Sequence, residues 1–411
     1  MNNKILISQP KVNKNRIEYS YIVEGEWKNL FFIENEKYIE YSIDVENVPK
    51  SILIIPFLAN ILPVTWVCDA EIVVEECDKD FYEALPNIKK GYCDMHPGIN
   101  FKGSIIAKKI VNNSQEKTGG AISFFSGGVD AFSTLVTHAS EHPTLITLQG
   151  ADLTLDDTIG WEKVVKHIKD TCKKFDTDYV LVKSTFRSIY DQNKLTEIVV
   201  NSKDNWWHGF QHGIGIISHA APIAYVMKKE ITYFASSFTI AEKGKVTCAS
   251  DPTIDNNIKF CGTSVWHDGY DFNRQAKIKN IIAYSKANKI EISLRVCWES
   301  AGGSNCCNCE KCWRTMLGIY AEGFNPRNFG FEYTDEQLKL LSSKMRFSEN
   351  KFFRISTYLP IQRAMNDNIR KKDLPKAIRW FYHADLHSLG KGKAWFRVMQ
   401  KTRSILKRIT N

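Results

Sequence analysis

Apolar residues alternate with polar ones along much of the first 115 residues. Between Arg16 and Val23, Ile17 and Tyr19 alternate with more polar neighbours, and this period of two is typical of a half-buried strand. Further strands are expected at Asn29–Ile33, Tyr38–Ile43, Ser51–Ile55, Ala70–Glu75 and Ser104–Ile110. The pattern predicts a β-rich N-terminal domain over residues 1–115.

The periodicity changes after a polar segment at residues 112–120, which we interpret as a linker. Strands are then expected at Ala121–Phe125, Thr144–Leu148, Tyr179–Lys183 and Ile231–Ser236. Helices are expected between and after them, at Val129–His138, Trp161–Phe175, His212–Lys228 and Ala276–Asn288. This alternation favours a parallel sheet with helices on both faces. From about Gly323 the pattern is helical, and the capping box Thr334–Gln337 opens a helix.

A chain of 411 residues is long enough for two or three domains. We predict an α/β fold class in three parts. A β-rich domain (1–115) precedes a Rossmann-like parallel-sheet domain (119–325), and a helical extension (326–411) ends in a basic tail.

No segment predicts a membrane span or an export signal. The most apolar segment, Ile52–Cys68, is shorter than the roughly 20 residues of a spanning helix and contains Pro56 and Pro63, so we interpret it as a buried strand and turn. The N-terminal apolar run is too short for a secretory signal, and we expect a cytoplasmic protein.

The formal net charge of +9 is unevenly distributed. Residues 371–411 carry eleven Lys and Arg against two Asp, and the rest of the chain is balanced. Within Lys391–Arg408 the basic residues are interleaved with Trp395, Phe396 and aliphatic residues. Such a tail suits RNA, a membrane surface or another acidic partner, but a solvated helix packed by its apolar face gives the same pattern.

A glycine-rich loop, Phe125–Asp130, lies between a predicted strand and a predicted helix. The pair Gly127–Gly128 permits a tight turn that brings backbone N–H groups toward an anion, and the helix N-terminus adds partial positive charge. No Gly-Lys-Ser/Thr follows, so it is not a Walker A loop. A phosphate-binding loop and a plain Gly-Gly turn both fit these residues. After the next strand, Gln149 and Gly150 are candidate adenine or ribose contacts or an ordinary loop.

Five of the eleven cysteines lie between Cys297 and Cys312. Clustered thiols in an intracellular chain indicate metal binding, and four of them have spacings that can close a tetrahedral zinc site. We predict a structural Zn²⁺ site and treat Cys307 as a bystander that could exchange with its neighbour. A redox Cys-x2-Cys is the competing interpretation. The predicted ligands are Cys297, Cys306, Cys309 and Cys312.

The loop resembles the Ser-Gly-Gly-x-Asp-Ser motif of the PP-loop ATP pyrophosphatases, the adenine nucleotide α-hydrolase-like family. The resemblance implies that Ser126 to Asp130, including Gly127, Gly128 and Val129, hold the pyrophosphate of ATP and its Mg²⁺. The family's last Ser is Ala131 here, and Ser133, on the next part of the helix, is a candidate nucleotide-binding residue in its place. Together with the cysteine spacing, residues 119–325 resemble the 7-cyano-7-deazaguanine synthases, as a divergent member.

Further polar residues lie between the two motifs. His267, Asp268, Arg274 and Lys277 are candidates for binding substrate or the leaving pyrophosphate, although surface charge explains the last two equally well. His208 and His212 are spaced to share one helix face, as a metal pair or a packed pair.

The resemblance implies an ATP-dependent adenylating enzyme of the C–N ligase or amidotransferase type, with ATP, Mg²⁺ and Zn²⁺. A carboxylate or carbonyl oxygen of a small molecule or protein terminus attacks the α-phosphorus, and ammonia or an amine then displaces AMP. We expect no covalent enzyme intermediate, although Cys248 and Cys261 leave a thiolation variant open. A tRNA-modifying enzyme and a non-catalytic nucleotide sensor are the alternatives, and a homo-oligomer is expected.

Overall fold

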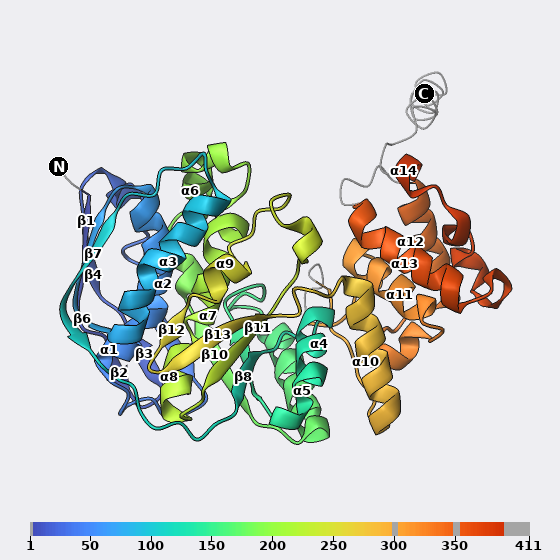
Figure 1. Ribbon diagram of the computed structural model, residues 1–411, viewed down its shortest axis with the longest axis horizontal. Coiled ribbons are helices and arrows are strands. Elements are labelled where there is room, and N and C mark those ends of the chain that lie inside the picture. The colour runs from blue at the N-terminus through green and yellow to red at the C-terminus, as the bar shows by residue number, and fades with distance from the viewer. Residues whose placement is uncertain (1–2, 298–302, 348–353, 390–411) are drawn as a thin grey trace. The chain divides into compact units, whose positions relative to one another are not determined.

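The computed structural model describes residues 3–297, 303–347 and 354–389 (Figure 1). The chain forms two compact units, residues 1–271 and 272–411. It is an α/β protein, as the sequence predicts, but both of its sheets are mixed rather than purely parallel. The predicted boundary near residue 115 does not separate two units, because strands on either side of it belong to one sheet. The cysteine cluster groups with the C-terminal helices and not with the glycine-rich loop.

The first unit contains a four-stranded and a nine-stranded sheet. The smaller sheet has the order β4-β1-β6-β7, with β1 antiparallel to β4 and parallel to β6, which is parallel to β7. Its strands are β1 (Lys4–Ile7), β4 (Tyr21–Glu24), β6 (Glu71–Asp78) and β7 (Ser104–Val111). The strands predicted at residues 70–75 and 104–110 are confirmed, but the strand predicted over residues 16–23 is divided between the two sheets.

The nine-stranded sheet has the order β12-β13-β11-β8-β9-β10-β5-β3-β2. Its five central strands, from β13 to β10, are parallel, and the strands outside them pair antiparallel. The central strands are β8 (Ala121–Phe124), β9 (Thr144–Gln149), β10 (Tyr179–Ser184), β11 (Ile231–Ala235) and β13 (Thr263–Asp268). The outer strands are β2 (Lys11–Asn13), β3 (Arg16–Glu18), β5 (Tyr38–Tyr41) and β12 (Lys259–Phe260).

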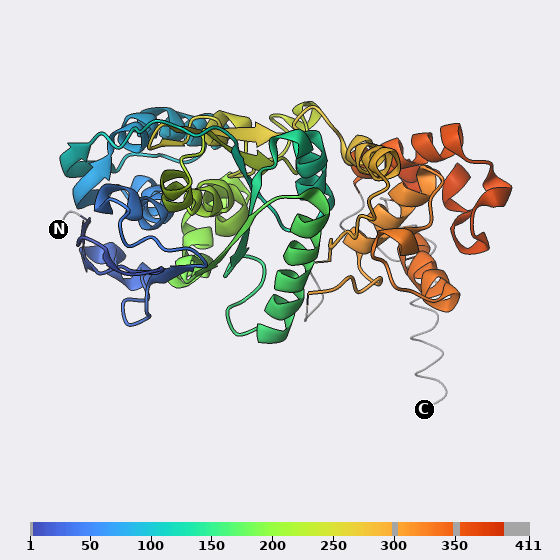
Figure 2. The same ribbon diagram turned by 90° about the horizontal axis from the view of Figure 1, so that it is seen from below.

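Helices cover both faces of the nine-stranded sheet, as the βα alternation predicts. α4 (Val129–Thr137) and α5 (Thr158–Phe175) lie beside each other on one face, and α7 (His212–Ile217) and α8 (Ala220–Val226) lie on the other (Figures 1 and 2). A π-helical turn, η5 (Trp207–Gln211), leads into α7. Further α-helices of this unit are α1 (Lys50–Leu53), α2 (Ile55–Val67), α3 (Lys79–Met95), α6 (Gln192–Ile198) and α9 (Pro252–Asp255).

The N-terminal segment is less β-rich than its sequence pattern suggests. The predicted strand at residues 51–55 and the turn after it are wrong, because Lys50–Leu53 forms helix α1 and Ile55–Val67 forms helix α2. The residues of α2 from Ile55 to Trp66 are all buried. A helix that is apolar on every side belongs in an interior. The predicted strand at residues 29–33 is likewise wrong, since Glu26–Leu30 forms the 3-10 helix η1 and only Phe31 makes an isolated bridge.

One hydrophobic core joins both sheets of the first unit. It includes Ile5 and Ile72 of the small sheet, Ile122 and Val180 of the large one, and most of the apolar residues of α2. The N-terminal segment therefore completes the fold of the glycine-rich-loop region. None of the described helices has the length and hydrophobicity that crossing a membrane requires.

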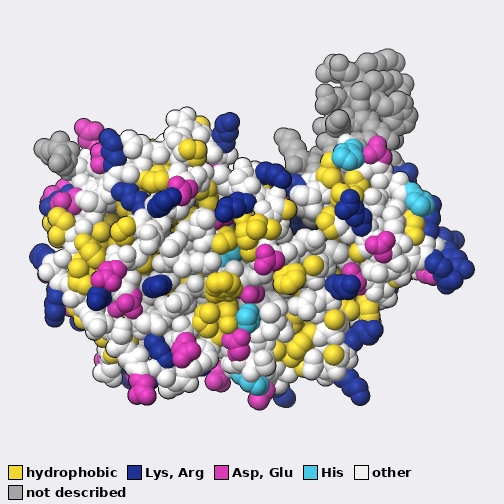
Figure 3. All heavy atoms as spheres, viewed as in Figure 1, with side chains coloured by type: hydrophobic (Ala, Val, Ile, Leu, Met, Phe, Trp, Pro, Cys, Tyr) yellow, Lys and Arg dark blue, Asp and Glu magenta, His cyan; other side chains and the backbone are white. Residues whose placement is uncertain are grey.

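The second unit is helical, as predicted for the chain after residue 323. α11 packs against α10 and α13, and α12 also contacts α11. The bounds are α10 (Arg274–Asn288), α11 (Glu310–Ala321), α12 (Asp335–Phe347), α13 (Ile355–Asn368) and α14 (Leu386–Leu389). Much of the basic tail, at residues 390–411, lies outside the described residues. On the face in Figure 3, basic and acidic side chains are interspersed, in keeping with the balanced charge of the remaining chain.

Candidate nucleotide loop and four-cysteine centre

The glycine-rich loop lies at the switch point of the large sheet. From β8 the chain runs through α4 to β9 on one side, whereas β11 pairs with β8 on the other side. In sheets of this kind, ligands bind beyond the carboxyl ends of the strands, at the point where the connections diverge. The loop at residues 125–128 follows β8 and occupies that position.

Local geometry opens the loop toward a ligand. Gly127 has a φ of 78°, in the left-handed region that favours glycine. Gly128 is the N-cap of α4 and makes no side-chain capping bond, and its N–H donates to Ser126 Oγ over 3.4 Å. Backbone N–H groups of the first turn of α4 therefore face the loop without a capping side chain, which is the arrangement that binds anions.

The predicted loop residues differ in exposure. Ser126 is exposed and Asp130, in the first turn of α4, is half-buried. Val129 and Ser133 are buried, with 0% and 3% exposure, so they face the core of the unit. Ser126, Gly128 and Asp130 are the loop residues with surface available to a ligand.

The predicted contacts after β9 hold their own loop together. The Gln149 amide donates to the carbonyl oxygens of Thr154, over 3.0 Å, and Leu155. Gly150, with a φ of 102°, lies so close to β10 that a Cβ would come within 2.0 Å of the Ser184 carbonyl oxygen. These contacts give both residues a structural part in shaping the carboxyl end of β9.

Arg274 and Lys277, predicted to contact substrate or pyrophosphate, belong to the second unit. Both lie on α10, where Arg274 donates to Thr315 Oγ1 over 3.2 Å and Lys277 is 2% exposed. In the first unit, Asp268 accepts hydrogen bonds from Thr134 over 2.7 Å and His138 over 3.1 Å, and so it joins α4 to β13.

The four predicted cysteine ligands converge in the second unit. Their Sγ atoms all lie within 4.8 Å of one another, with 3.8 Å between Cys297 and Cys309 and 4.0 Å between Cys306 and Cys312. A tetrahedral Zn–S₄ site with bonds of about 2.3 Å separates its sulfurs by about 3.8 Å. The four cysteines can therefore hold a metal ion such as zinc, as the spacing predicts.

Backbone hydrogen bonds hold this cysteine cluster in place. Cys309 is the N-cap of α11, and its Sγ accepts the Cys312 N–H over 3.4 Å. The Asn305 side chain joins the neighbouring segments, because it accepts from the Val296 N–H and donates to the carbonyl oxygens of Leu294 and Gly330.

The thiols of the cluster influence one another. The pKa of Cys309 is lowered to about 5, chiefly by the hydrogen bond from the Cys312 thiol. Cys307 turns away from the cluster, with its Sγ 3.9 Å from the Asn305 carbonyl oxygen, and burial raises its pKa to about 12.

One polar cluster was only partly predicted. His208 and His212, identified as a spaced pair, both lower the pKa of the Cys248 thiol. Asp204 and Thr247, which complete the cluster, were missed, because no local spacing connects residues 204–212 to residues 247–248. The signal available in the sequence was the placement of two histidines four residues apart on a helical segment.

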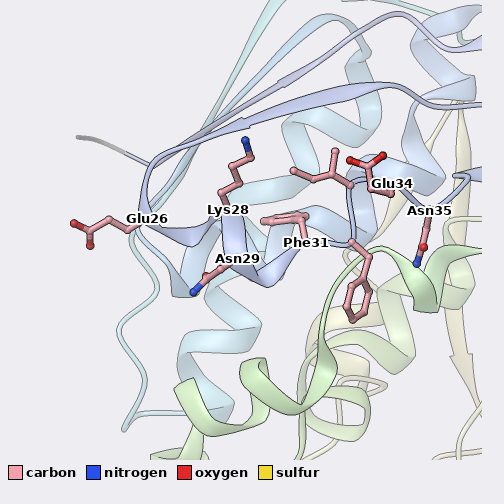
Figure 4. A pocket seen from close by; sticks show the side chains of 8 residues that line it. Glu26, Lys28, Asn29, Phe31, Glu34 and Asn35 are labelled. Atoms are coloured by element: carbon pink, nitrogen blue, oxygen red, sulfur yellow. The ribbon is translucent and has the colours of Figure 1, made fainter.

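A surface hollow lies away from the predicted residues. It is formed by η1 and the segment after it (Figure 4). The exposed side chains of Phe32 and Ile33 belong to it. It is lined by Glu26, Lys28, Asn29, Phe31, Phe32, Ile33, Glu34 and Asn35. None of the predicted site residues is among them.

Comparison of the chain with family models, with curated proteins and with solved structures finds no match.

Proposed function

We propose that the protein is an ATP-dependent adenylating enzyme that releases pyrophosphate and forms a C–N bond. The observation that carries this proposal is the Ser-Gly-Gly-x-Asp loop at the switch point of the parallel sheet. The resemblance to PP-loop ATP pyrophosphatases, and to 7-cyano-7-deazaguanine synthases among them, gives the reaction class. The strand order of the five parallel strands is that of doubly wound nucleotide-binding sheets.

The loop is suited to the pyrophosphate part of ATP. Gly127 and Gly128 allow close approach of the backbone, and the α4 N-terminus favours negative charge. The Asp130 carboxylate, in the first turn of the helix, would hold Mg²⁺ beside the phosphates, since Mg²⁺ prefers oxygen ligands. The Ser126 hydroxyl is exposed at the mouth of the loop and would donate to a phosphate oxygen.

The reaction then has two steps. A carboxylate or carbonyl oxygen of the substrate attacks the α-phosphorus, the bond to the bridging oxygen breaks, and pyrophosphate leaves with the electron pair. A nitrogen nucleophile then displaces AMP from the activated carbon. In such chemistry the protein supplies mainly positioning and charge neutralisation. The substrate would be a small molecule or a protein terminus.

The four-cysteine centre would serve this enzyme as a structural zinc site. Four thiolates fill a tetrahedral coordination shell and leave no position for substrate. The site ties the segment at residues 294–297 to the start of α11.

Product analysis tests the adenylation. Zinc-loaded protein is incubated with MgATP and fractionated small molecules from the source cell, and nucleotides are separated by chromatography. Wild type should form AMP and pyrophosphate, and Asp130→Asn should lower the rate about 100-fold or more because it weakens the metal and phosphate contacts. Asp170→Asn, an exposed change on α5, should match wild type. Formation of ADP and phosphate, or retention of bound ATP unchanged in every fraction, would contradict the proposal.

A glycine pair sharpens the test. Gly127→Ala places a Cβ at a φ of 78° and should weaken ATP binding, whereas Gly128→Ala retains an allowed φ of −79°. Equal ATP affinity in the two variants would show that the loop conformation is not the binding determinant.

A further inference from the structure

A cysteine, two histidines and a carboxylate meet in the first unit, outside the glycine-rich loop. The segment after β11 returns to η5, where the Ala249 N–H donates to the His208 carbonyl oxygen over 2.7 Å. This contact places Cys248 beside His208, and the imidazoles of His208 and His212 both lower the pKa of its thiol. The Cys248 N–H donates to Met95 Sδ on α3 over 3.4 Å, which fixes the backbone on its other side.

The orientation of His208 is set by Asp204. Nδ1 of His208 lies 2.9 Å from one Asp204 carboxylate oxygen and 3.1 Å from the other. The Thr247 hydroxyl donates to the same carboxylate over 2.6 Å. Because Asp204 engages Nδ1, Nε2 is the ring nitrogen that can face a further partner. A thiol, an imidazole and an orienting carboxylate in this order are the components of an activated nucleophile.

The cluster is tied to the carboxyl edge of the large sheet. The ring of His212 lies 6.1 Å from Phe234 near the end of β11 and 5.2 Å from Trp207. The Arg187 guanidinium, after β10, lies 4.0 Å from the Trp207 ring and donates to the Ala151 carbonyl oxygen after β9. The glycine-rich loop follows β8, which lies between β9 and β11. Both sites therefore belong to the same edge of one sheet.

Charge favours the thiolate at this position. Burial acts against ionisation of Cys248, but the hydrogen bonds from His208 and His212 outweigh it and lower the pKa to about 7. The pKa of His208 is raised to about 10, first by its hydrogen bond to Asp204. Burial instead raises the pKa of Cys172 and Cys261 to about 12. The titratable groups around the cluster are Tyr92, His96, Asp204, His208, His212 and Asp255.

Two buried polar atoms beside the cluster are available to a ligand. Asp255 accepts hydrogen bonds through Oδ2 from His267 Nδ1, over 2.8 Å, and Ser250. Within the described part of the chain, Asp255 Oδ1 and His212 Nδ1 are buried and have no hydrogen-bond partner. Buried polar groups are almost always satisfied, so an unpaired acceptor and ring nitrogen point to a hydrogen-bonding guest. An amine N–H could donate the hydrogen bond that Asp255 Oδ1 lacks.

We propose that Cys248 is a catalytic nucleophile that receives the activated acyl group and passes it to the nitrogen donor. The inference rests on the proposed adenylation, because the adenylate is the acyl source. The thiolate sulfur attacks the acyl carbon, a C–S bond forms, and the C–O bond to AMP breaks, with AMP taking the electron pair. The amine nitrogen then attacks the thioester carbon, the C–S bond breaks to restore the thiolate, and a proton of the amine passes to His212 or Asp255.

This assignment departs from the expectation of no covalent intermediate and separates two cysteines that the sequence left equivalent. Cys261 is completely buried and its pKa is raised, so it is unsuited to attack. Cys248 is 6% exposed and the side chain of His208 is 36% exposed, which leaves an approach beside the imidazole.

The first arm of the test needs no ATP. The full zinc-loaded chain is treated with limiting iodoacetamide between pH 5 and 10, and each cysteine peptide is quantified by mass spectrometry. The labelling rate of Cys248 should be half-maximal near pH 7, and exposed Cys93 serves as the reference for the reagent. Absence of Cys248 labelling in the native protein, or labelling only above pH 9, would overturn the assignment.

The second arm follows turnover in the substrate fraction that supports AMP formation. Cys248→Ala should release pyrophosphate in a first turnover but lower steady turnover about 100-fold or more, and Cys261→Ala should match wild type. Wild type should accumulate a hydroxylamine-sensitive acyl adduct on Cys248 when the amine is withheld. Reversible methylthiolation of wild-type Cys248 gives the same comparison if the alanine variant does not fold. Turnover of Cys248→Ala within about twofold of wild type refutes the nucleophile. Normal thiolate reactivity without pyrophosphate release in any fraction refutes the adenylation instead.

Discussion

The protein contains two thiol sites whose surroundings are opposite. Cys248 in the first unit has two imidazoles that lower the pKa of its thiol, and one of these imidazoles is held by a carboxylate. In the second unit, four cysteines surround one another, with sulfur–sulfur separations of 3.8 and 4.0 Å between two of the pairs. The cysteine side chain therefore has imidazoles as neighbours in the first site and other thiols as neighbours in the second.

The difference shows how neighbours determine what a thiol can do. Imidazolium groups stabilise one thiolate and leave its sulfur with an electron pair for attack. Four thiolates repel one another unless a cation lies between them, and that cation uses all their lone pairs directed inward. We therefore expect the two sites to respond separately to metal removal and to substitution of the histidines.

The largest expected effect follows loss of a zinc ligand. Cys309→Ser removes one of four sulfurs and the N-cap contact of α11, so bound zinc should fall from one equivalent to nearly none. Structural zinc contributes on the order of 10 kcal/mol of binding free energy, so the melting temperature should fall by about 10 °C or more. Elemental analysis and calorimetry measure the two quantities.

The matched control for this ligand is its neighbour in sequence. Cys307→Ser changes a buried thiol outside the cluster and should retain one equivalent of zinc. The labelling profile of Cys248 should be the same in both variants if the two sites act separately. Equal zinc loss in Cys309→Ser and Cys307→Ser would show that the cluster is not the metal site.

The next effect concerns the histidine that holds the thiolate. His208→Gln removes the charged partner of Cys248, so the thiol pKa should rise from about 7 toward the higher values of the other buried cysteines. At pH 7 the thiolate fraction and the alkylation rate should fall about 20-fold. Zinc content should not change. A wild-type labelling profile in this variant would assign the low thiol pKa to His212 alone.

The features that the sequence predicted correctly are local. The strand, glycine loop and helix from Ala121 to Thr137 are adjacent along the chain, and the four cysteine ligands lie within 16 residues. The periodicity of apolar residues and the spacing of motif residues indicate such features directly. The order of the parallel strands and the antiparallel extension by N-terminal strands depend on distant pairings, which a local pattern does not contain.

Helix α2 shows why a local pattern can also mislead. Its residues are apolar on every side, so the period of 3.6 that identifies a surface helix is absent. Pro56 lies in its first turn, where the missing N–H is tolerated, and Pro63 lies inside the helix, where proline is normally unfavourable. Burial among both sheets, through contacts distant in sequence, overrides the local signal.

The prediction of the Cys248 cluster was incomplete for the same reason. The spacing in the sequence could pair His208 with His212. Their thiol partner, Cys248, belongs to the segment after β11, which the fold brings back to the two histidines. Only the fold shows that Cys248 and not Cys261 meets the imidazoles.

The smallest expected effects follow substitution of the residues that orient His208, and they separate the orientation of its imidazole from its charge. Asp204→Asn retains the shape of the side chain but removes the carboxylate that raises the pKa of His208 to about 10. Without the carboxylate, the His208 imidazole is less basic and carries its positive charge less often. The Cys248 pKa should therefore rise, and alkylation at pH 7 should slow about fivefold, which is less than the effect of losing His208 itself. Thr247→Val, which removes one hydrogen bond to Asp204 and no charge, should change the rate about twofold at most.

The pH dependence of stability gives an independent check of this last substitution. A histidine whose folded pKa is raised contributes stability that is complete below its unfolded pKa of about 6.5 and is lost as pH rises through about 10. Asp204→Asn should therefore destabilise the protein more at pH 6 than at pH 10 in urea unfolding. The difference should be modest because the His208 side chain is 36% exposed and solvent screens its charge. Equal destabilisation at both pH values would mean that Asp204 acts by packing. Its charge would then have no part in holding His208 beside Cys248.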